Sequence, residues 1–165
     1  MESWLDQCRA WCKQAKYLAE ELDWNERQNH AGALRGTSAL LDHNLTSIPG
    51  LFFEGELQRG NFGLYQKYAV MHRATGRAHR VFTLEVYPFH KRSHRDVSGD
   101  IYGPHLHLGD DRIEGLSHAV REVLCNLDPS SLAGWIARFR RHAKIKEDTG
   151  RRLTPPYSDD LFGLE

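Results

Sequence analysis

The first part of the chain carries apolar side chains at the spacing of an amphipathic helix. Between residues 3 and 24 these side chains recur every three or four positions, which gathers them on one side of a helix. Ser3 and Asp6 have the spacing of a capping box, a common signal for the start of a helix. The pattern therefore predicts an N-terminal helix over residues 3–24.

From residue 51 onward the apolar positions alternate, which is the period of a β-strand. The segment HRVFTLEVYP (79–88) places Phe82, Leu84 and Val86 on one face. The segment GLYQKYAVMH (63–72) is rich in residues that favour strands, and a turn-forming ATGRA separates the two. We therefore expect an antiparallel hairpin from these two segments.

A further strand is expected over residues 101–108, IYGPHLHL, whereas residues 25–50 mix apolar and turn-forming residues and predict no single element. After Gly109 the helical period returns, over residues 116–127 and again after Ser130 or Ser131, either of which could cap a second helix.

These elements predict an α+β fold. An antiparallel sheet, made of the hairpin and the His-x-His strand, carries the N-terminal helix and the two C-terminal helices on one face. Residues 1–146 are expected to form a single domain and residues 147–165 a polar C-terminal tail.

Composition adds one unusual feature to this picture, which is histidine. The 165 residues include ten histidines, and six of them lie between residues 72 and 107. Lys plus Arg and Asp plus Glu each total 22, so the net charge is zero and does not indicate a polyanionic partner. No apolar run is long enough to span a membrane, and three cysteines suit free thiols better than a disulfide framework. We expect a cytoplasmic protein, of prokaryotic or phage origin on size alone, that does not bind membranes.

The segment GDIYGPHLHLGDD (99–111) is the strongest candidate for chemistry. Side chains alternate across a strand, so His105 and His107 share one face. Two such imidazoles can bind one divalent transition-metal ion, with His94, Asp100 or Asp111 as a third ligand. A mononuclear metal site built from His94, His105 and His107 is one hypothesis.

Known histidine families fit this segment poorly. The spacing from Gly99 to His105 and His107 matches the opening of a cupin motif, but helical patterns follow where a cupin needs more strands. A histidine-triad hydrolase would carry a third histidine where the chain has Gly109, and neither His105 nor His107 is followed by the Ser or Thr of a two-motif phosphoesterase.

The second hypothesis is proton transfer without a metal or other cofactor. Histidine titrates near neutral pH, so His105 or His107 could act as general base and the other, or His94, as general acid. Arg92 and Arg95 could stabilise the charge of a phosphodiester under attack. This is our first-ranked prediction from the sequence: metal-independent RNA cleavage by a ribonuclease with a toxin–antitoxin or phage–host conflict role.

A third hypothesis assigns the histidines a structural role and makes the chain a binding or inhibitory module. The segment RFRRHAKIK (138–146) holds five basic residues and no acid, and Arg138, Arg141 and Lys144 fall near one helical face. With Lys91 they could contact the phosphates of RNA or DNA, although the same pattern fits an ordinary solvated helix face. A protein partner or a homodimer is equally open.

The stretch HRDVSGDIYGPHLHLGD (94–110) resembles an uncharacterised bacterial and phage family of unknown function. Its pattern is His-x-Asn-Pro-x-Gly-x-Ile-x-Gly-x-His-x-His, following a basic antiparallel hairpin, and the resemblance covers residues 50–108. The matching residues are His94, Gly99, Ile101, Gly103, His105 and His107, while Asp96 and Val97 replace the usual Asn-Pro. The resemblance implies that the three histidines belong to one site, and it implies no activity.

Overall fold

The computed structural model describes the whole chain except five segments. These are residues 62, 97–98, 110–119, 124–126 and 158–165. Two helices and eleven strands make up the described part. In chain order they are α1 (Trp4–Lys13), β1 (Lys16–Leu18), β2 (Asn25–Glu26), β3 (Ala33–Leu41), β4 (Ser47–Gly60), β5 (Gly63–His72), β6 (His79–Val86), β7 (Arg92–Asp96), β8 (Gly99–Tyr102), β9 (His105–Leu108), β10 (Val120–Val123), α2 (Leu132–Ala143) and β11 (Ile145–Lys146).

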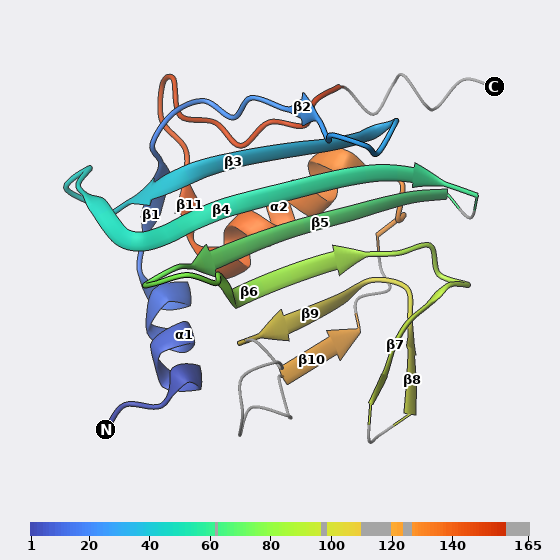
Figure 1. Cartoon of the computed structure of the whole chain (residues 1–165), viewed down its shortest axis with the longest axis horizontal. Coiled ribbons are helices and arrows are strands. Elements are labelled where there is room, and N and C mark those ends of the chain that lie inside the picture. Colours follow the sequence, from blue (N-terminus) through green and yellow to red (C-terminus); the bar gives the residue numbers. More distant parts are fainter. Residues whose placement is uncertain (62, 97–98, 110–119, 124–126, 158–165) are drawn as a thin grey trace.

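A curled, mostly antiparallel sheet dominates the molecule (Figure 1). Its strands run in the order β10-β9-β6-β5-β4-β3-β1-β11, and β2 pairs with β3 beside this path. The pair β1 and β11 is parallel and joins segments from the two ends of the chain. Strands β7 and β8 form a separate two-stranded hairpin between β6 and β9 in the sequence. The fold is thus mixed α+β, as expected.

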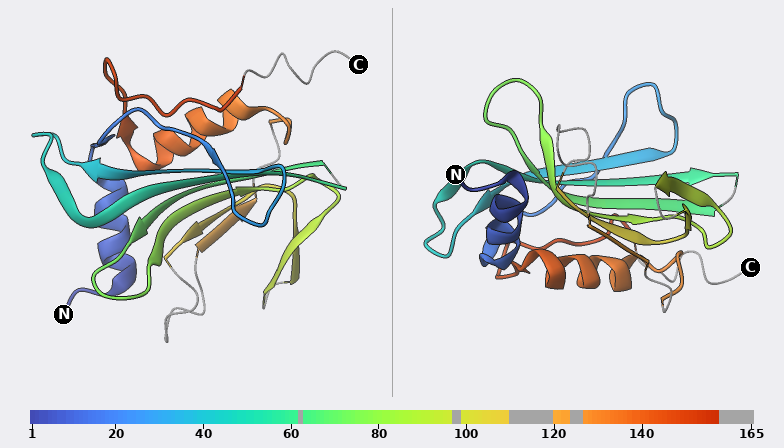
Figure 2. Two further views of the ribbon diagram at one scale, coloured as in Figure 1. Left: turned by 45° about the horizontal axis from the view of Figure 1, so that its top comes forward. Right: turned by 90° about the horizontal axis from the view of Figure 1, so that it is seen from below.

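The two faces of the sheet differ in character. Helix α2 lies along one face (Figure 2), where Phe139 packs on Phe53 and Phe82 with ring centroids 5.7 and 5.8 Å apart. Strand alternation turns every second side chain to the other face. Buried Glu54 and Glu85 lie there, opposite the apolar core. The sheet therefore presents an apolar face to α2 and a polar face away from it.

The N-terminal helix begins where the sequence predicts it and ends earlier. Ser3 caps α1, because its Oγ accepts a hydrogen bond of 3.2 Å from the backbone N–H of Asp6. The prediction that the helix continues to residue 24 is wrong, since α1 ends at Lys13 and β1 follows. Strand β1 pairs with β3 and with β11, and this long-range pairing outweighs the helical spacing of its residues.

The prediction of a helix over residues 116–127, the first of the two C-terminal helices, is also wrong. Residues 120–123, inside the expected helix 116–127, form β10 and pair antiparallel with β9; the rest of that span, apart from residue 127, lies outside the described residues. Pairing with β10 protects the otherwise open edge of β9. The second helix is confirmed as α2, with Ser131 at its N-cap and Leu132, Trp135 and Phe139 in the core.

The segment after β11 packs more closely than a polar tail would. Leu153 is buried in the core, and the indole N–H of Trp24 donates a 2.8 Å hydrogen bond to the carbonyl of Thr154. The remainder of the predicted tail, from residue 158, lies outside the described residues. Neither helix in the described part of the chain is long and apolar enough to cross a membrane.

The central predictions for the sheet are confirmed. Strands β5 and β6 form the expected antiparallel hairpin, and Gly76 in its turn has a φ of 63°, a conformation that glycine adopts without strain. The strand expected over 101–108 is divided at Gly103 and Pro104 into β8 and β9. The unassigned residues 25–50 contain β2, β3 and the start of β4.

Candidate metal centre

Neighbouring strands β6 and β9 place one carboxylate, Glu85, and two imidazoles, His105 and His107, on the polar face of the sheet. Their antiparallel register sets Glu85 opposite His105 and Thr83 opposite His107. The intervening Leu84 and Leu106 belong to the core, so Glu85, His105 and His107 all point away from α2.

The β7–β8 hairpin supplies the fourth side chain, His94. The register of this hairpin shifts between Arg92 and His94, which makes Ser93 the extra residue of a β-bulge. A bulge re-aims side chains that would otherwise alternate. As a result both Ser93 and His94, although adjacent in sequence, contact the histidines of β9.

The four side chains form what we call the His/Glu cluster: Glu85, His94, His105 and His107. The Nε2 atoms of His94 and His105 each lie 2.9 Å from Oε2 of Glu85, and Nε2 of His107 lies 3.5 Å from the same oxygen. One donor atom from each of the four residues lies within 4.8 Å of all the others. The three rings stand nearly edge to face, with centroids 4.7 to 4.8 Å apart and interplanar angles of 73 to 87°. Their nitrogen atoms therefore converge on a common point.

The cluster is almost completely enclosed. His105 is 0% exposed and His107 is 1% exposed, and the carboxylate of Glu85 is buried as well. The side chain of His94 is 27% exposed, so the hairpin side is where this cluster meets solvent.

The protonation of His105 follows from its other nitrogen. Nδ1 lies 3.1 Å from the carbonyl oxygen of Gly103 and 3.2 Å from Oγ of Ser93. Ser93 Oγ donates its single proton to the carbonyl of Ile101, so towards His105 it acts as an acceptor. Both partners of Nδ1 are acceptors, and Nδ1 therefore carries a proton. If the ring carries no second proton, Nε2 presents a lone pair to Glu85.

A ring nitrogen 2.9 Å from a carboxylate oxygen needs either a proton or a metal ion between the two atoms. His94 presents the same difficulty, because its Nε2 lies 2.9 Å from Glu85 Oε2 and 3.2 Å from Nε2 of His107. A single proton on that nitrogen can serve only one of these contacts. One metal ion at the centre of the cluster would satisfy all four donor atoms together.

The spacing of the donors fits such an ion. In tetrahedral coordination with bonds of about 2.0–2.1 Å, ligand atoms lie about 3.3 Å apart. Four separations between donors of the cluster are 2.9, 2.9, 3.2 and 3.5 Å, and all four donors lie within 4.8 Å of one another. Imidazole and carboxylate ligands together suit Zn²⁺ and other first-row divalent metals.

The charge states of the cluster are also those that a metal requires. Burial opposes ionisation of Glu85, but its close polar contacts with His105, His107 and His94 hold the pKa of Glu85 well below its usual range. Burial is the main cause that lowers the pKa of His107, against the opposing effect of Glu85. At neutral pH the cluster therefore presents an anionic carboxylate and an unprotonated His107.

Residues around the cluster hold its side chains in place. The carbonyl of Gly103, which fixes the His105 ring, belongs to a residue with a φ of 72°. A Cβ at this position would come within 3.2 Å of Phe89, so a larger residue would move the carbonyl. On the other side the ring of Tyr87 stacks on His105 with an interplanar angle of 10°. These contacts correspond to the outer shell that orients histidine ligands in metal sites.

The structure brings the three predicted histidines together and pairs Arg92 and Arg95, the predicted phosphate clamp, with an acidic residue. Arg92 and Arg95 form ion pairs with Asp100 at 3.6 and 3.7 Å, and both guanidinium groups belong to the hairpin. Asp100 is thus engaged with the arginines, and the alternative ligand Asp111 lies outside the described residues.

The predicted nucleic-acid contacts are divided between two faces. Lys91 lies on the side of the cluster, with its Nζ 5.2 Å from the centre of the Tyr87 ring. Arg138, Arg141 and Lys144 lie on or next to α2, which covers the opposite face of the sheet. Arg138 stacks over Trp135 at 5.3 Å, while Arg141 and Lys144 are exposed. The structure does not join these residues into one basic surface.

The sequence analysis missed Glu85, the residue on which the histidines converge. The sequence contains a signal for it. In HRVFTLEVYP the apolar residues Phe82, Leu84 and Val86 occupy one face of the strand, so Glu85 lies on the other face, where it can meet the histidines of a neighbouring His-x-His strand. Arg80 was also missed, and its Nη1 lies 4.0 Å from Oε1 of Glu85.

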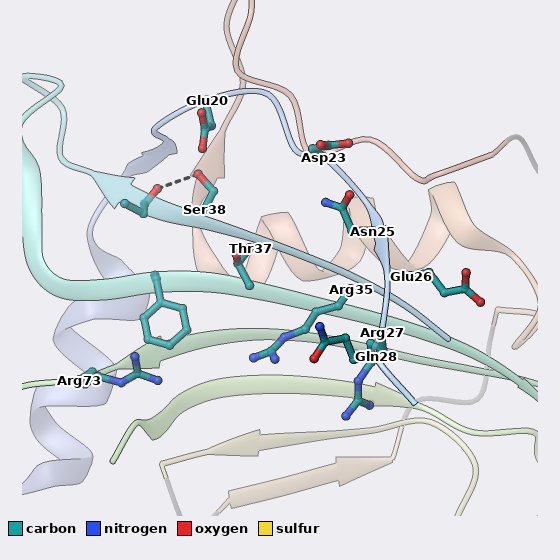
Figure 3. A pocket seen from close by; sticks show the side chains of 12 residues that line it. Glu20, Asp23, Asn25, Glu26, Arg27, Gln28, Arg35, Thr37, Ser38 and Arg73 are labelled. Atoms are coloured by element: carbon teal, nitrogen blue, oxygen red, sulfur yellow. Dashed lines mark hydrogen bonds between the residues drawn. The ribbon is translucent and has the colours of Figure 1, made fainter. Parts of the chain in front are cut away.

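A broad groove lies elsewhere, between the β2–β3 region and β4 (Figure 3). It measures about 960 Å³ and carries both acidic and basic side chains, including Glu20, Asp23, Arg35 and Arg73. Arg35 is ion-paired to Glu54, and Arg73 lies over the ring of Phe52 at 5.6 Å. Its mixed and partly paired charges do not select one class of ligand, and it shares no residue with the His/Glu cluster.

Comparison with known proteins adds no family to these observations, because no family model, no curated protein and no solved structure matches the chain.

Proposed function

We propose that this chain is a mononuclear metalloprotein. It binds one divalent transition-metal ion, with Zn²⁺ as the best fit, through Nε2 of His94, His105 and His107 and the carboxylate of Glu85. The observation that carries the proposal is the convergence of three imidazole nitrogens on one carboxylate oxygen, with the proton of His105 fixed on the far nitrogen. A bound ion of this kind would supply Lewis acidity to a ligand that enters as a fifth donor.

The geometry favours a metal over proton transfer by free histidines. A general acid or base must come within hydrogen-bond reach of its substrate. His105 and His107 are buried, and their nitrogens point at Glu85. The predicted clamp residues Arg92 and Arg95 are paired with Asp100. Metal-free RNA cleavage stays a prediction, and it would require the hairpin to move away from β9.

Metal binding by purified protein tests the proposal. Chelator-treated protein is dialysed against Zn²⁺, Fe²⁺ or Mn²⁺, and metal content and Zn²⁺ affinity are measured for the wild type, His105→Ala, Glu85→Gln and the control His43→Ala. His43 is an exposed histidine outside the cluster. We expect one equivalent of zinc in the wild type and the control, and an affinity at least 100-fold lower in both cluster variants, because each removes a ligand.

Two results would contradict the proposal. One is a folded wild type that takes up none of the three metals. The other is a His105→Ala variant that binds zinc as tightly as the control. An RNA cleavage assay with and without chelator separates the alternatives, because a metal-free ribonuclease would keep its activity in chelator and lose it in His105→Ala and His107→Ala.

A further inference from the structure

A buried hydroxyl group lies next to the proposed metal centre without a hydrogen-bond partner. Thr83 is 0% exposed, and its Oγ1 is unpaired within the described residues. Thr83 precedes Glu85 by two residues on β6 and lies opposite His107 on β9, so its side chain is on the face of the His/Glu cluster. A buried polar atom is costly unless a partner satisfies it, and no partner of Thr83 Oγ1 lies among the described residues, so a bound ligand could supply one.

A cation lies beside the carboxylate of the same cluster. Nη1 of Arg80 is 4.0 Å from Oε1 of Glu85, whereas the three histidines contact Oε2. Arg80 and Glu85 are five residues apart on one strand, a separation of about 16 Å between their backbones. Their side chains must lean towards each other to come this close. Along the strand, Thr83 lies between the two residues. The guanidinium group is partly exposed, with 21% of the side chain accessible.

A divalent ion in the cluster would make this region strongly positive. The ion contributes two positive charges and Arg80 one, against the single negative charge of Glu85. An added ligand would reach the ion by expanding its coordination from four to five, a change that zinc undergoes in catalytic sites. A ligand that enters here would meet the metal, a guanidinium group and a free hydroxyl donor, which together recognise an oxygen anion.

We propose that the metal centre binds a small oxyanion, a phosphate or a carboxylate group, and that Arg80 and Thr83 determine this specificity. The inference rests on the proposed metal centre. One anionic oxygen binds the metal, the hydroxyl of Thr83 donates a hydrogen bond to the group, and Arg80 forms an ion pair with it. The enclosure of the cluster limits the ligand to a small anion or to the anionic end of a longer molecule.

Titration of zinc-loaded protein with inorganic phosphate and with acetate tests the proposal. The key variant is Thr83→Val, which keeps the shape of the side chain and removes only a hydroxyl that has no partner, so folding and zinc content should be unchanged. Arg80→Met removes the cation. The matched controls are Thr37→Val and Arg77→Met, which alter exposed residues away from the cluster.

We expect the wild type and both controls to bind at least one of the two anions. Thr83→Val and Arg80→Met should each weaken that binding roughly tenfold or more, the usual effect of losing a hydrogen bond to a charged group. Binding of phosphate alone or of acetate alone supports the proposal and identifies the ligand class.

Three results separate the failures. If zinc binds and neither anion does, the oxyanion proposal is wrong and the metal centre stands. If Thr83→Val binds the anions as tightly as the wild type, the assigned role of the hydroxyl is wrong. If the wild type takes up no zinc, the metal centre itself is wrong, and the oxyanion site falls with it.

Discussion

At the scale of single residues, Ser93 orients the ring of His105, which the proposed metal centre requires as a ligand. Its Oγ accepts from Nδ1 of His105 and donates to Ile101, so it keeps the lone pair of Nε2 directed at the metal position. We expect Ser93→Ala to weaken zinc binding about tenfold with no change in stoichiometry, because Gly103 still accepts from Nδ1. A competition titration against a chelator of known affinity measures this.

The control for this change is Ser47→Ala, which alters an exposed serine at the start of β4. Equal zinc affinities for the two alanine variants would show that Ser93 does not orient the ligand.

The candidate site was only partly predictable from the sequence, for reasons that lie in individual residues. Strand alternation places His105 and His107 together, and the spacing of the motif adds His94. The sequence pattern does not identify Glu85 as a site residue, because an acidic residue in an alternating strand ordinarily faces solvent. Only the pairing of β6 with β9, a contact between segments 20 residues apart, turns Glu85 towards the histidines.

At the scale of elements, local periodicity succeeds where an element is long and fails where distant pairing decides. The spacing in residues 63–72 and 79–86 predicts β5 and β6, and the apolar stripe after Ser131 predicts α2. Residues 16–18 and 120–123 have helical spacing, but they form β1 and β10 because strands β3 and β9 offer them partners. Such partners cannot be read from a local pattern.

A single lysine joins the ends of both helices. Nζ of Lys16 is buried and donates hydrogen bonds to the carbonyl of Ala143, the last residue of α2, and to that of Gln14 at the C-cap of α1, the latter at 2.8 Å. Burial lowers the pKa of Lys16 from 10.5 to about 8. Above pH 8 the folded chain loses this proton while the unfolded chain keeps it, so the free energy of unfolding should rise with pH until the unfolded pKa is reached.

Urea unfolding at pH 7.5 and pH 9 measures this effect. We expect the wild type to gain about 1 kcal/mol over this interval relative to Lys16→Met, which keeps the aliphatic stem and cannot titrate. The comparison cancels the titration of other groups that both proteins share. An equal pH dependence in the two proteins would show that Lys16 keeps an ordinary pKa.

At the scale of the whole molecule, the fold is held together by contacts between parts that are distant in the sequence. Strand β11 near the C-terminus pairs with β1 near the N-terminus, and the segment after it returns to Trp24. The β7–β8 hairpin lies outside the main sheet and meets β6 and β9 through His94 and Ser93. A metal ion in the His/Glu cluster would therefore bind the hairpin to the sheet.

This arrangement predicts that metal binding stabilises the entire chain. A ligand that binds only the folded state, at a free concentration 100 times its dissociation constant, contributes about 2.7 kcal/mol. For a chain of this size that corresponds to an increase of roughly 5–10 °C in melting temperature. We expect this increase when zinc is added to chelator-treated wild type and to His43→Ala, but not to His107→Ala, because the last loses a ligand at the centre of the cluster. An equal increase in His107→Ala would place the stabilising ion at some other position and would remove the link between the hairpin, the cluster and the sheet.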